Sequence, residues 1–142
     1  MPPSITIRRQ IALYRAELGA AGKGPPRELP LIKEVYCARS RAEAMAVAGP
    51  YLLGKYRDYA KWGQDKVMPD DEDFSRSFEE LIRGRFVLGS PEECYAELEP
   101  YCREFGVNHL VIRTHWAGMP LSAALASIRL ISDELLPALR KL

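Results

Sequence analysis

Apolar residues along the chain follow two patterns, one with helical spacing and one with short continuous runs. Ile7, Ile11, Tyr14 and Leu18 recur every three or four residues, which predicts an amphipathic helix. Short apolar runs bounded by glycine or proline instead predict strands. Together the patterns predict strands at 29–38 and 108–114, and helices at 4–19, 41–62, 91–105 and from residue 121 onward. This alternation is typical of an α/β fold with a parallel sheet.

Local signals mark the ends of several predicted helices. Ser4 is a candidate cap for the first helix, and Ser40–Glu43 has the serine–glutamate spacing of a capping box. Ser90–Glu93 repeats that box with proline at the first helical position, and Gly106 suits the left-handed residue that ends the same helix. Gly49–Pro50 lies inside the second helical pattern, so we expect a kink or a break there.

The most informative stretch of the chain is the apolar run Leu110–Ile112 together with the residues directly after it. A short run after a glycine suits a strand buried on both faces. In parallel α/β folds, ligands gather at the carboxyl ends of the strands. We therefore expect any chemistry near the polar and aromatic residues at the end of the run, which are Arg113, Thr114, His115 and Trp116.

The segment between the two predicted strands carries weaker signals. Residues 64–73 are predicted to form a loop, and we interpret its acidic cluster, Asp70–Asp73, as a solvated connection. The cluster lacks the ligand pattern and closing glutamate of a calcium loop. A short amphipathic helix is expected at 74–82, and 85–89 is expected to be a short extended segment.

Composition excludes several classes of protein. The 142 residues carry 47% hydrophobic and 27% charged side chains, which is typical of one globular domain. A net charge of +1 gives no bulk electrostatic reason to bind nucleic acid or anionic lipid. No apolar stretch approaches the ~18 residues of a membrane span, and the N-terminus lacks a signal-peptide core. Three cysteines without metal-binding spacing indicate reduced thiols in a cytoplasmic protein.

The polar residues near the second strand allow more than one interpretation. Ser90 is expected to be a helix cap rather than a nucleophile, although its helix start is a candidate anion site. His109 and His115 would lie ~20 Å apart on a regular strand, which excludes a shared metal. Arg113 is expected to form a salt bridge, or else to meet an anionic ligand. Trp116 either covers the end of a core or forms the wall of an aromatic ligand site.

Five segments of the sequence resemble one known family. They are 34–38, 56–63, 86–93, 106–113 and 116–120, and they include the helix start Gly89-Ser90-Pro91 and the strand start Gly106-Val107-Asn108. Their content and order are similar to the C-terminal part of the luciferase-like monooxygenases, the flavin-dependent bacterial luciferase superfamily. The resemblance covers nearly the whole chain.

The resemblance implies the fold of a (β/α)8 TIM barrel, of which this chain would be about the last third. Residues 1–142 would form a single incomplete domain, with the two clear strands as the seventh and eighth of the barrel. The family's insertion would occupy about 64–84. A complete barrel needs about 250 residues, so the first six strands would be missing.

The resemblance also implies a cofactor and a site. The family binds FMN or the deazaflavin F420 at the C-terminal face of the barrel, where a small organic substrate is oxidised. Tyr36, Arg113, His115, Trp116 and Met119 match strand-end or loop positions that line the family's flavin and substrate cavity. No motif assigns a catalytic residue, and no metal site is expected.

The sequence is compatible with three functional hypotheses. The first is an incomplete flavin-dependent monooxygenase that is inactive as an isolated chain. The second is a non-catalytic flavin-binding or assembly module, and the third is an α/β protein-interaction domain. A sheet of only two barrel strands would leave both of its edges unpaired. It would also be too small to bury the apolar faces of all the predicted helices. We therefore expect a homo-oligomer or a missing N-terminal part.

Overall fold

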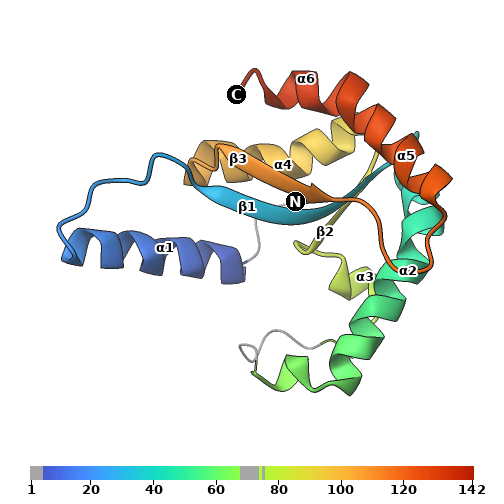
Figure 1. Cartoon of the computed structure of the whole chain (residues 1–142), viewed down its shortest axis with the longest axis horizontal. Helices are drawn as coiled ribbons and strands as arrows, with labels where there is room; N and C mark the ends of the chain where they lie inside the picture. Colours follow the sequence, from blue (N-terminus) through green and yellow to red (C-terminus); the bar gives the residue numbers. More distant parts are fainter. Residues whose placement is uncertain (1–4, 68–73, 75) are drawn as a thin grey trace.

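The computed structural model describes residues 5–67, 74 and 76–142. The expected cap Ser4 and the acidic cluster Asp70–Asp73 lie outside the described residues. Within the described part, the fold is α/β, with helices packed around a small parallel sheet (Figure 1).

In the described residues the sheet has three parallel strands in the order β2-β1-β3, so the strand β1 (Pro30–Cys37) is central. Its neighbour β3 (His109–Arg113) agrees with the sequence prediction, and the register pairs Glu34 with Arg113. The third strand, β2 (Phe86–Gly89), pairs with the other edge of β1, where Glu34 meets Phe86. The sequence predicts this segment only as extended chain, because four residues are too few to show a strand period.

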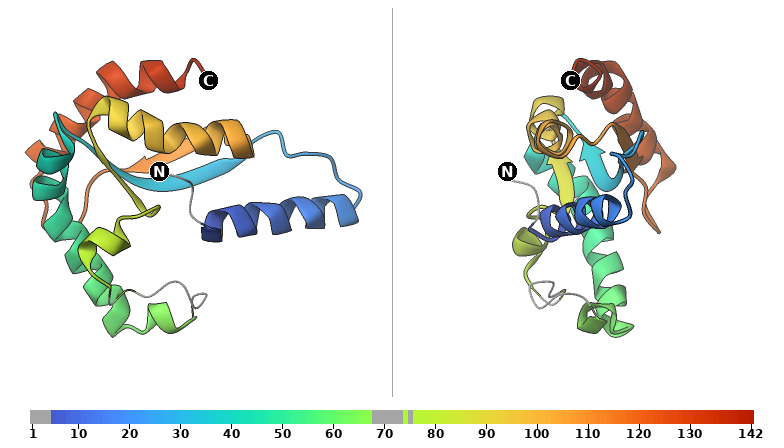
Figure 2. Two further views of the ribbon diagram at one scale, coloured as in Figure 1. Left: turned by 180° about the vertical axis from the view of Figure 1, so that it is seen from behind. Right: turned by 90° about the vertical axis from the view of Figure 1, so that its left-hand side faces the viewer.

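The expected helices are all present in the described part of the chain. The helical elements are α1 (Ile5–Ala20), α2 (Arg41–Lys61), the 3-10 turn η1 (Gln64–Val67), α3 (Phe78–Leu81), α4 (Pro91–Phe105), α5 (Leu121–Leu130), the π-helical turn η2 (Ile131–Leu135) and α6 (Leu136–Leu139). The helix α4 packs with η2 and α6 over one face of the sheet, α2 passes the carboxyl ends of the strands, and α1 lies on the opposite side of the sheet from α6 (Figures 1 and 2).

The helix ends follow the local sequence signals closely. Ser90 and Glu93 form the complete capping box of α4, and Gly106 ends this helix with φ 69°. Ser40 caps α2, but Glu43 accepts the backbone N–H of Arg39 rather than that of Ser40. The sequence predicts a kink or a break at Gly49–Pro50. The break is wrong, because α2 runs through both residues as one helix, and the kink stays a prediction.

The two faces of β1 enter separate parts of the core. Val35 and Cys37 pack against α4 and the C-terminal helices, in a cluster completed by Val87, Cys94, Leu98 and Leu135. Tyr36, on the opposite face, packs against α2 and the loop after β3, with Leu52, Leu88, Trp116 and Met119. The sheet therefore places the end of β3 directly beside α2.

The expectation that the second strand is buried on both faces is wrong for this chain. Residues of β3 alternate between half-buried and exposed, and Val111 is 41% exposed. On the same face of the sheet, Ile32 of β1 is 64% exposed. The physical reason is that β3 is an edge strand, and no described element covers this part of the face. We call Ile32 and Val111 the open apolar face.

The helix α5 also presents apolar side chains to solvent. Ala124 and Ser127 are its buried positions, while Leu121, Leu125 and Ile128 are exposed. The expectation that the sheet cannot bury the apolar faces of all the helices is confirmed for α5. We call these three exposed residues the α5 stripe.

Candidate functional site

A cavity of about 540 Å³ lies at the carboxyl end of β3. It is an open cavity between the second half of α2 and the loop that joins β3 to α5, so segments about fifty residues apart in sequence meet there. Its functional side chains come from α2 (Lys55, Asp58, Tyr59, Trp62), from the end of β3 (Arg113) and from the following loop (His115, Trp116). We call this space the strand-end cavity.

The loop after β3 is held in one shape by bonds within it. The backbone N–H of Met119 donates to the carbonyl of Trp116 over 3.0 Å, and Nε2 of His115 lies 2.9 Å from the carbonyl oxygen of Met119. Gly118 adopts φ 83°, which a residue with a side chain would adopt only under strain. The loop consequently turns Trp116 inward, with its ring centre 6.4 Å from that of Tyr36.

Glu34 does not line the strand-end cavity, but it contacts three residues that do, Lys55, Arg113 and Trp116. Its Oε1 accepts Nε1–H of Trp116 over 3.3 Å, lies 3.6 Å from Nη1 of Arg113, and is paired with Nζ of Lys55. One carboxylate oxygen thus joins β1 to α2, to β3 and to the loop after β3. Sequence reasoning missed Glu34 and Lys55. The available signal was a carboxylate in strand alternation between Ile32 and Tyr36.

Three of the five predicted site residues line the strand-end cavity. Arg113, His115 and Trp116 do so, whereas Tyr36 and Met119 are not among its lining residues. Tyr36 is buried and donates its hydroxyl to the carbonyl of Ala123 over 3.0 Å, so it links β1 to the first turn of α5. Met119 is also buried, in the same cluster.

The alternatives for Arg113 and Trp116 are not exclusive in the structure. The salt bridge expected for Arg113 is present, with Glu34 as its partner, and the guanidinium still borders the cavity. Trp116 belongs to the buried core, and it also forms part of the cavity wall.

The helix start at Ser90 is not suited to an anion. Oγ of Ser90 donates to a carboxylate oxygen of Glu92 over 2.7 Å, and its backbone N–H donates to Glu93 over 2.9 Å. These bonds from Ser90 lower the pKa of both glutamates, which stabilises their charged forms. Two carboxylates therefore already occupy the candidate anion site at this helix start.

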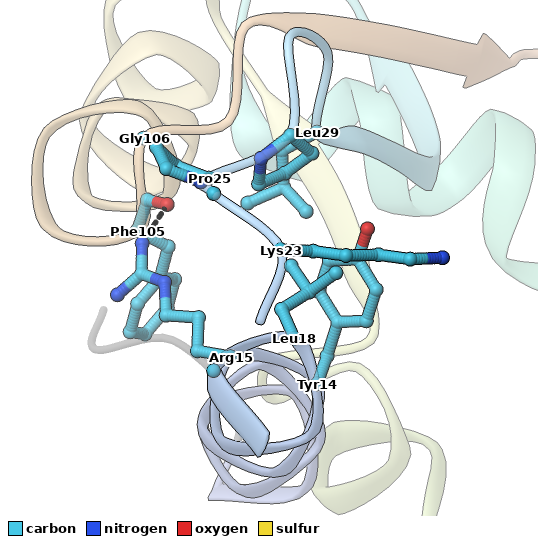
Figure 3. Close-up of a pocket in the computed structure, with 11 residues that line it drawn as sticks. Tyr14, Arg15, Leu18, Lys23, Pro25, Leu29, Phe105 and Gly106 are labelled. Atoms are coloured by element: carbon cyan, nitrogen blue, oxygen red, sulfur yellow. Dashed lines mark hydrogen bonds between the residues drawn. The ribbon is translucent and has the colours of Figure 1, made fainter. Parts of the chain in front are cut away.

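A second cavity, of about 370 Å³, lies at the opposite end of the strands (Figure 3). Arg15 of α1 crosses its edge and donates to the carbonyl of Phe105 over 2.5 Å, which holds α1 against the C-terminal end of α4. Lys23, Pro25 and Leu29 contribute further to its lining. In parallel α/β folds this end of the sheet serves stability rather than chemistry.

The two histidines lie apart in the described structure. His109 pairs loosely with the carboxylate of Glu28, at 3.7 Å, and His115 belongs to the loop after β3. Among residues 5–67, 74 and 76–142, no three histidine, cysteine or acidic side chains are grouped as metal ligands would be. No helix of the described chain has the length and apolar character needed to cross a membrane.

Comparison with known proteins gives matches in structure. Neither a protein-family model nor a curated protein sequence matches the chain. The monooxygenase RslO1 from Streptomyces bottropensis is similar over 97% of this chain and 40% of its own length, with a TM-score of 0.70 and 22% identity. The crystal structure of apo-MsnO8 is similar over 91% of this chain and 41% of its own, with a TM-score of 0.59 and 25% identity.

A third similar structure contains a flavin. It is the oxygenating constituent of 3,6-diketocamphane monooxygenase from the CAM plasmid of Pseudomonas putida, a type II Baeyer–Villiger monooxygenase in complex with FMN. It is similar over 91% of this chain and 38% of its own, with a TM-score of 0.62 and 20% identity.

These matches define the class of fold to which the chain belongs. It has the fold of one part of the luciferase-like monooxygenases, and the resemblance indicated by the sequence segments is confirmed at that level. The chain spans about 40% of the length of the structures it matches.

Proposed function

We propose that this chain forms the C-terminal part of a flavin-dependent monooxygenase barrel, to which β1, β2 and β3 would contribute strands. Because β2 lies between β1 and β3 in the chain, these two are not the successive seventh and eighth strands that are expected from the sequence. Residues 1–142 would be one incomplete domain, with an insertion at about 64–84. The observation that carries the proposal is the structural similarity to RslO1, which extends over 97% of this chain, combined with a cavity at the carboxyl end of β3. Ligands of parallel barrels bind at that end of the strands.

The strand-end cavity suits the ring of a flavin or an organic substrate, but not a flavin phosphate. Its volume of about 540 Å³ lies within the usual range for ligand pockets, and Tyr59, Trp62 and Trp116 supply aromatic walls. In the part of the chain that the structure describes, the suggested phosphate site at Ser90 is filled by carboxylates. FMN is favoured as the cofactor by the FMN complex among the similar structures, and F420 stays a prediction.

The residues of the chain would position and shield the reacting molecules. A bound reduced flavin would supply the activation of oxygen. Arg113 would offer a fixed positive charge to an oxygen of the ligand, because Glu34 holds its guanidinium at the strand end. Trp116 and Tyr59 would exclude water from one side of the cavity. His115, held at the Met119 carbonyl, would present its other ring face to the cavity.

The isolated chain would not complete this site. A flavin site in a barrel draws on loops after several strands, and the described sheet has three. The remaining strands would come from further polypeptide, from a second copy or from another protein. Catalytic activity is therefore proposed only for the completed barrel.

A second candidate function is that of an assembly module without catalysis. The open apolar face and the α5 stripe favour it, because both present large apolar side chains to solvent on a small domain. The two proposals differ in whether the strand-end cavity takes a flavin ring.

Binding of riboflavin, which lacks the phosphate, tests the proposed site. We expect weak quenching of riboflavin fluorescence by the 142-residue chain, with binding weakened several-fold by Trp62→Ala, because base or ring stacking on an aromatic side chain contributes about 1–3 kcal/mol. Leu13→Ala, on the exposed surface of α1, serves as the matched control. Equal effects of the two substitutions would reject the strand-end cavity as the flavin site.

A further inference from the structure

Glu34 has one carboxylate oxygen with three partners and one with none. Oε1 is contacted by Lys55, Arg113 and Trp116, whereas Oε2 is buried and has no hydrogen-bond partner in the described residues. The residue as a whole is 9% exposed. Buried polar atoms in native proteins are almost always hydrogen-bonded, so a free buried acceptor requires an explanation.

A purely structural ion pair does not provide that explanation. Burying a carboxylate is costly unless its oxygens are satisfied by donors. A stabilising arrangement would distribute Lys55 and Arg113 over the two oxygens, as a carboxylate readily allows. The structure instead places these donors on Oε1, which leaves the buried Oε2 without a hydrogen-bond partner among the described residues.

Glu34 borders a second space on the same face of the sheet. This cavity, of about 290 Å³, is lined by Ile32 and Glu34 of β1, Tyr56 of α2, Phe74 and Arg113, among others. Arg113 also borders the strand-end cavity, so its guanidinium lies between the two spaces. The guanidinium carries five N–H donors, and its contact with Glu34 is a long one at 3.6 Å. Arg113 therefore retains donors for another oxygen.

The geometry points to Glu34 as the acceptor of a ligand site. We propose that Oε2 of Glu34 accepts a hydroxyl or N–H group of a small organic ligand, while Arg113 binds a carboxylate or carbonyl oxygen of the same molecule. The apolar side chains of Ile32 and Phe74 suit an aromatic body between those two groups. This proposal rests on the proposed function, since the same face would line the interior of the complete barrel, and it names the substrate class as a hydroxylated aromatic acid or a close analogue.

A matched pair of small probes tests this ligand chemistry on the 142-residue chain. The first probe is 3-hydroxybenzoate, which carries both groups, and the second is 3-methoxybenzoate, which lacks only the hydroxyl donor. Binding is followed by the indole N–H NMR signal of Trp116, because this N–H donates to Glu34. We expect the hydroxylated probe to bind about tenfold more tightly or better, as for other hydrogen bonds to a charged group.

Substitutions assign the effect to the residues. Glu34→Gln should remove the preference for the hydroxylated probe, whereas Glu104→Gln, which alters an exposed ion pair with Arg8, should leave it unchanged. Arg113→Met should weaken both probes by a similar factor and preserve the preference. If the NMR spectrum of the Glu34→Gln variant lacks the dispersion of a folded chain, the effect of Arg113→Met on the two probes decides whether the proposal stands.

Three results would overturn the proposal. They are equal affinity for the two probes, a preference that survives Glu34→Gln, and no shift of the Trp116 signal with either probe. These results are independent of riboflavin binding, so failure of the Glu34 site and failure of the proposed flavin site are distinguishable.

Discussion

At the scale of single residues, burial in the folded chain alters the protonation of Lys33. Its side chain is buried, Nζ donates to the carbonyl of Gly84 over 2.5 Å, and it lies 4.7 Å from the ring centre of Tyr101. Burial lowers the pKa of Lys33 from its ordinary value of 10.5 to about 8, although the nearby carboxylate of Glu97 opposes the shift. The folded state therefore binds a proton at Lys33 less readily than the unfolded chain does.

The lowered pKa of Lys33 predicts a pH dependence of stability. Between pH 8 and 10.5 the unfolded chain keeps this proton and the folded chain releases it, so the free energy of unfolding should rise with pH. The gain is lost as pH falls through about 8, and its upper limit is about 3 kcal/mol. Urea unfolding at several pH values, compared with Lys33→Met, isolates this contribution from other groups that titrate in the range.

The control for this prediction is Lys61→Met, because Lys61 is exposed on α2. The control should follow the pH profile of the unsubstituted chain. A Lys33→Met profile parallel to that of the unsubstituted chain between pH 8 and 10 would show that Lys33 does not titrate as described.

At the scale of elements, the features predicted correctly from the sequence are those that depend on residues close together in the chain. The capping box at Ser90 and the left-handed Gly106 were predictable because each signal lies within a few residues of the helix end. The exposed face of β3 was not predictable, because the burial of a strand depends on elements that are distant in sequence. In the same way, strand-end reasoning predicted Arg113 and Trp116 in the cavity. It missed Glu34, since its role requires the β1–β3 register and the position of α2.

The junction between β2 and α4 should tolerate no added side chain. A Cβ on Gly89 would lie 2.8 Å from both Cβ and Oε2 of Glu93, in the first turn of α4. Gly89→Ala should therefore destabilise the chain by about 1–3 kcal/mol through overpacking and disturbance of the cap. Urea unfolding midpoints measure this effect.

Gly54 provides the matched comparison for Gly89. It lies exposed inside α2, and nothing lies within 4 Å of the position that a Cβ would take. Gly54→Ala should stabilise the chain by up to about 1 kcal/mol, as expected for alanine in a helix interior. A Gly89→Ala midpoint at or above that of the unsubstituted chain would contradict the described packing.

At the scale of the whole molecule, the apolar surface remains incompletely covered. The open apolar face spans the central strand β1 and the edge strand β3, and the α5 stripe lies on a helix that packs against β1. The similar structures extend well beyond the part that this chain matches. We propose that further strands and helices of a barrel, from further polypeptide, a second copy or another protein, cover both surfaces in the functional protein.

This uncovered surface predicts association or dye binding by the isolated chain. Sedimentation should show oligomers, or a hydrophobic dye should bind strongly. Leu125→Glu, in the α5 stripe, should reduce either signal because a charge opposes apolar contact. Leu13→Glu places the same charge on the exposed surface of α1 and should have a smaller effect. A compact monomer that binds no dye would contradict the prediction.

The central claim is that the chain supplies part of a flavin site without the phosphate contacts, and calorimetric titration of FMN against riboflavin tests it most directly. Two or three charge-assisted hydrogen bonds to a phosphate would favour FMN by roughly two to six orders of magnitude, at about 1.5–3 kcal/mol each. We predict weak binding of both flavins with affinities within about threefold of one another. Sub-micromolar binding of FMN, together with much weaker binding of riboflavin, would contradict the account, because the chain would then build a phosphate site of its own.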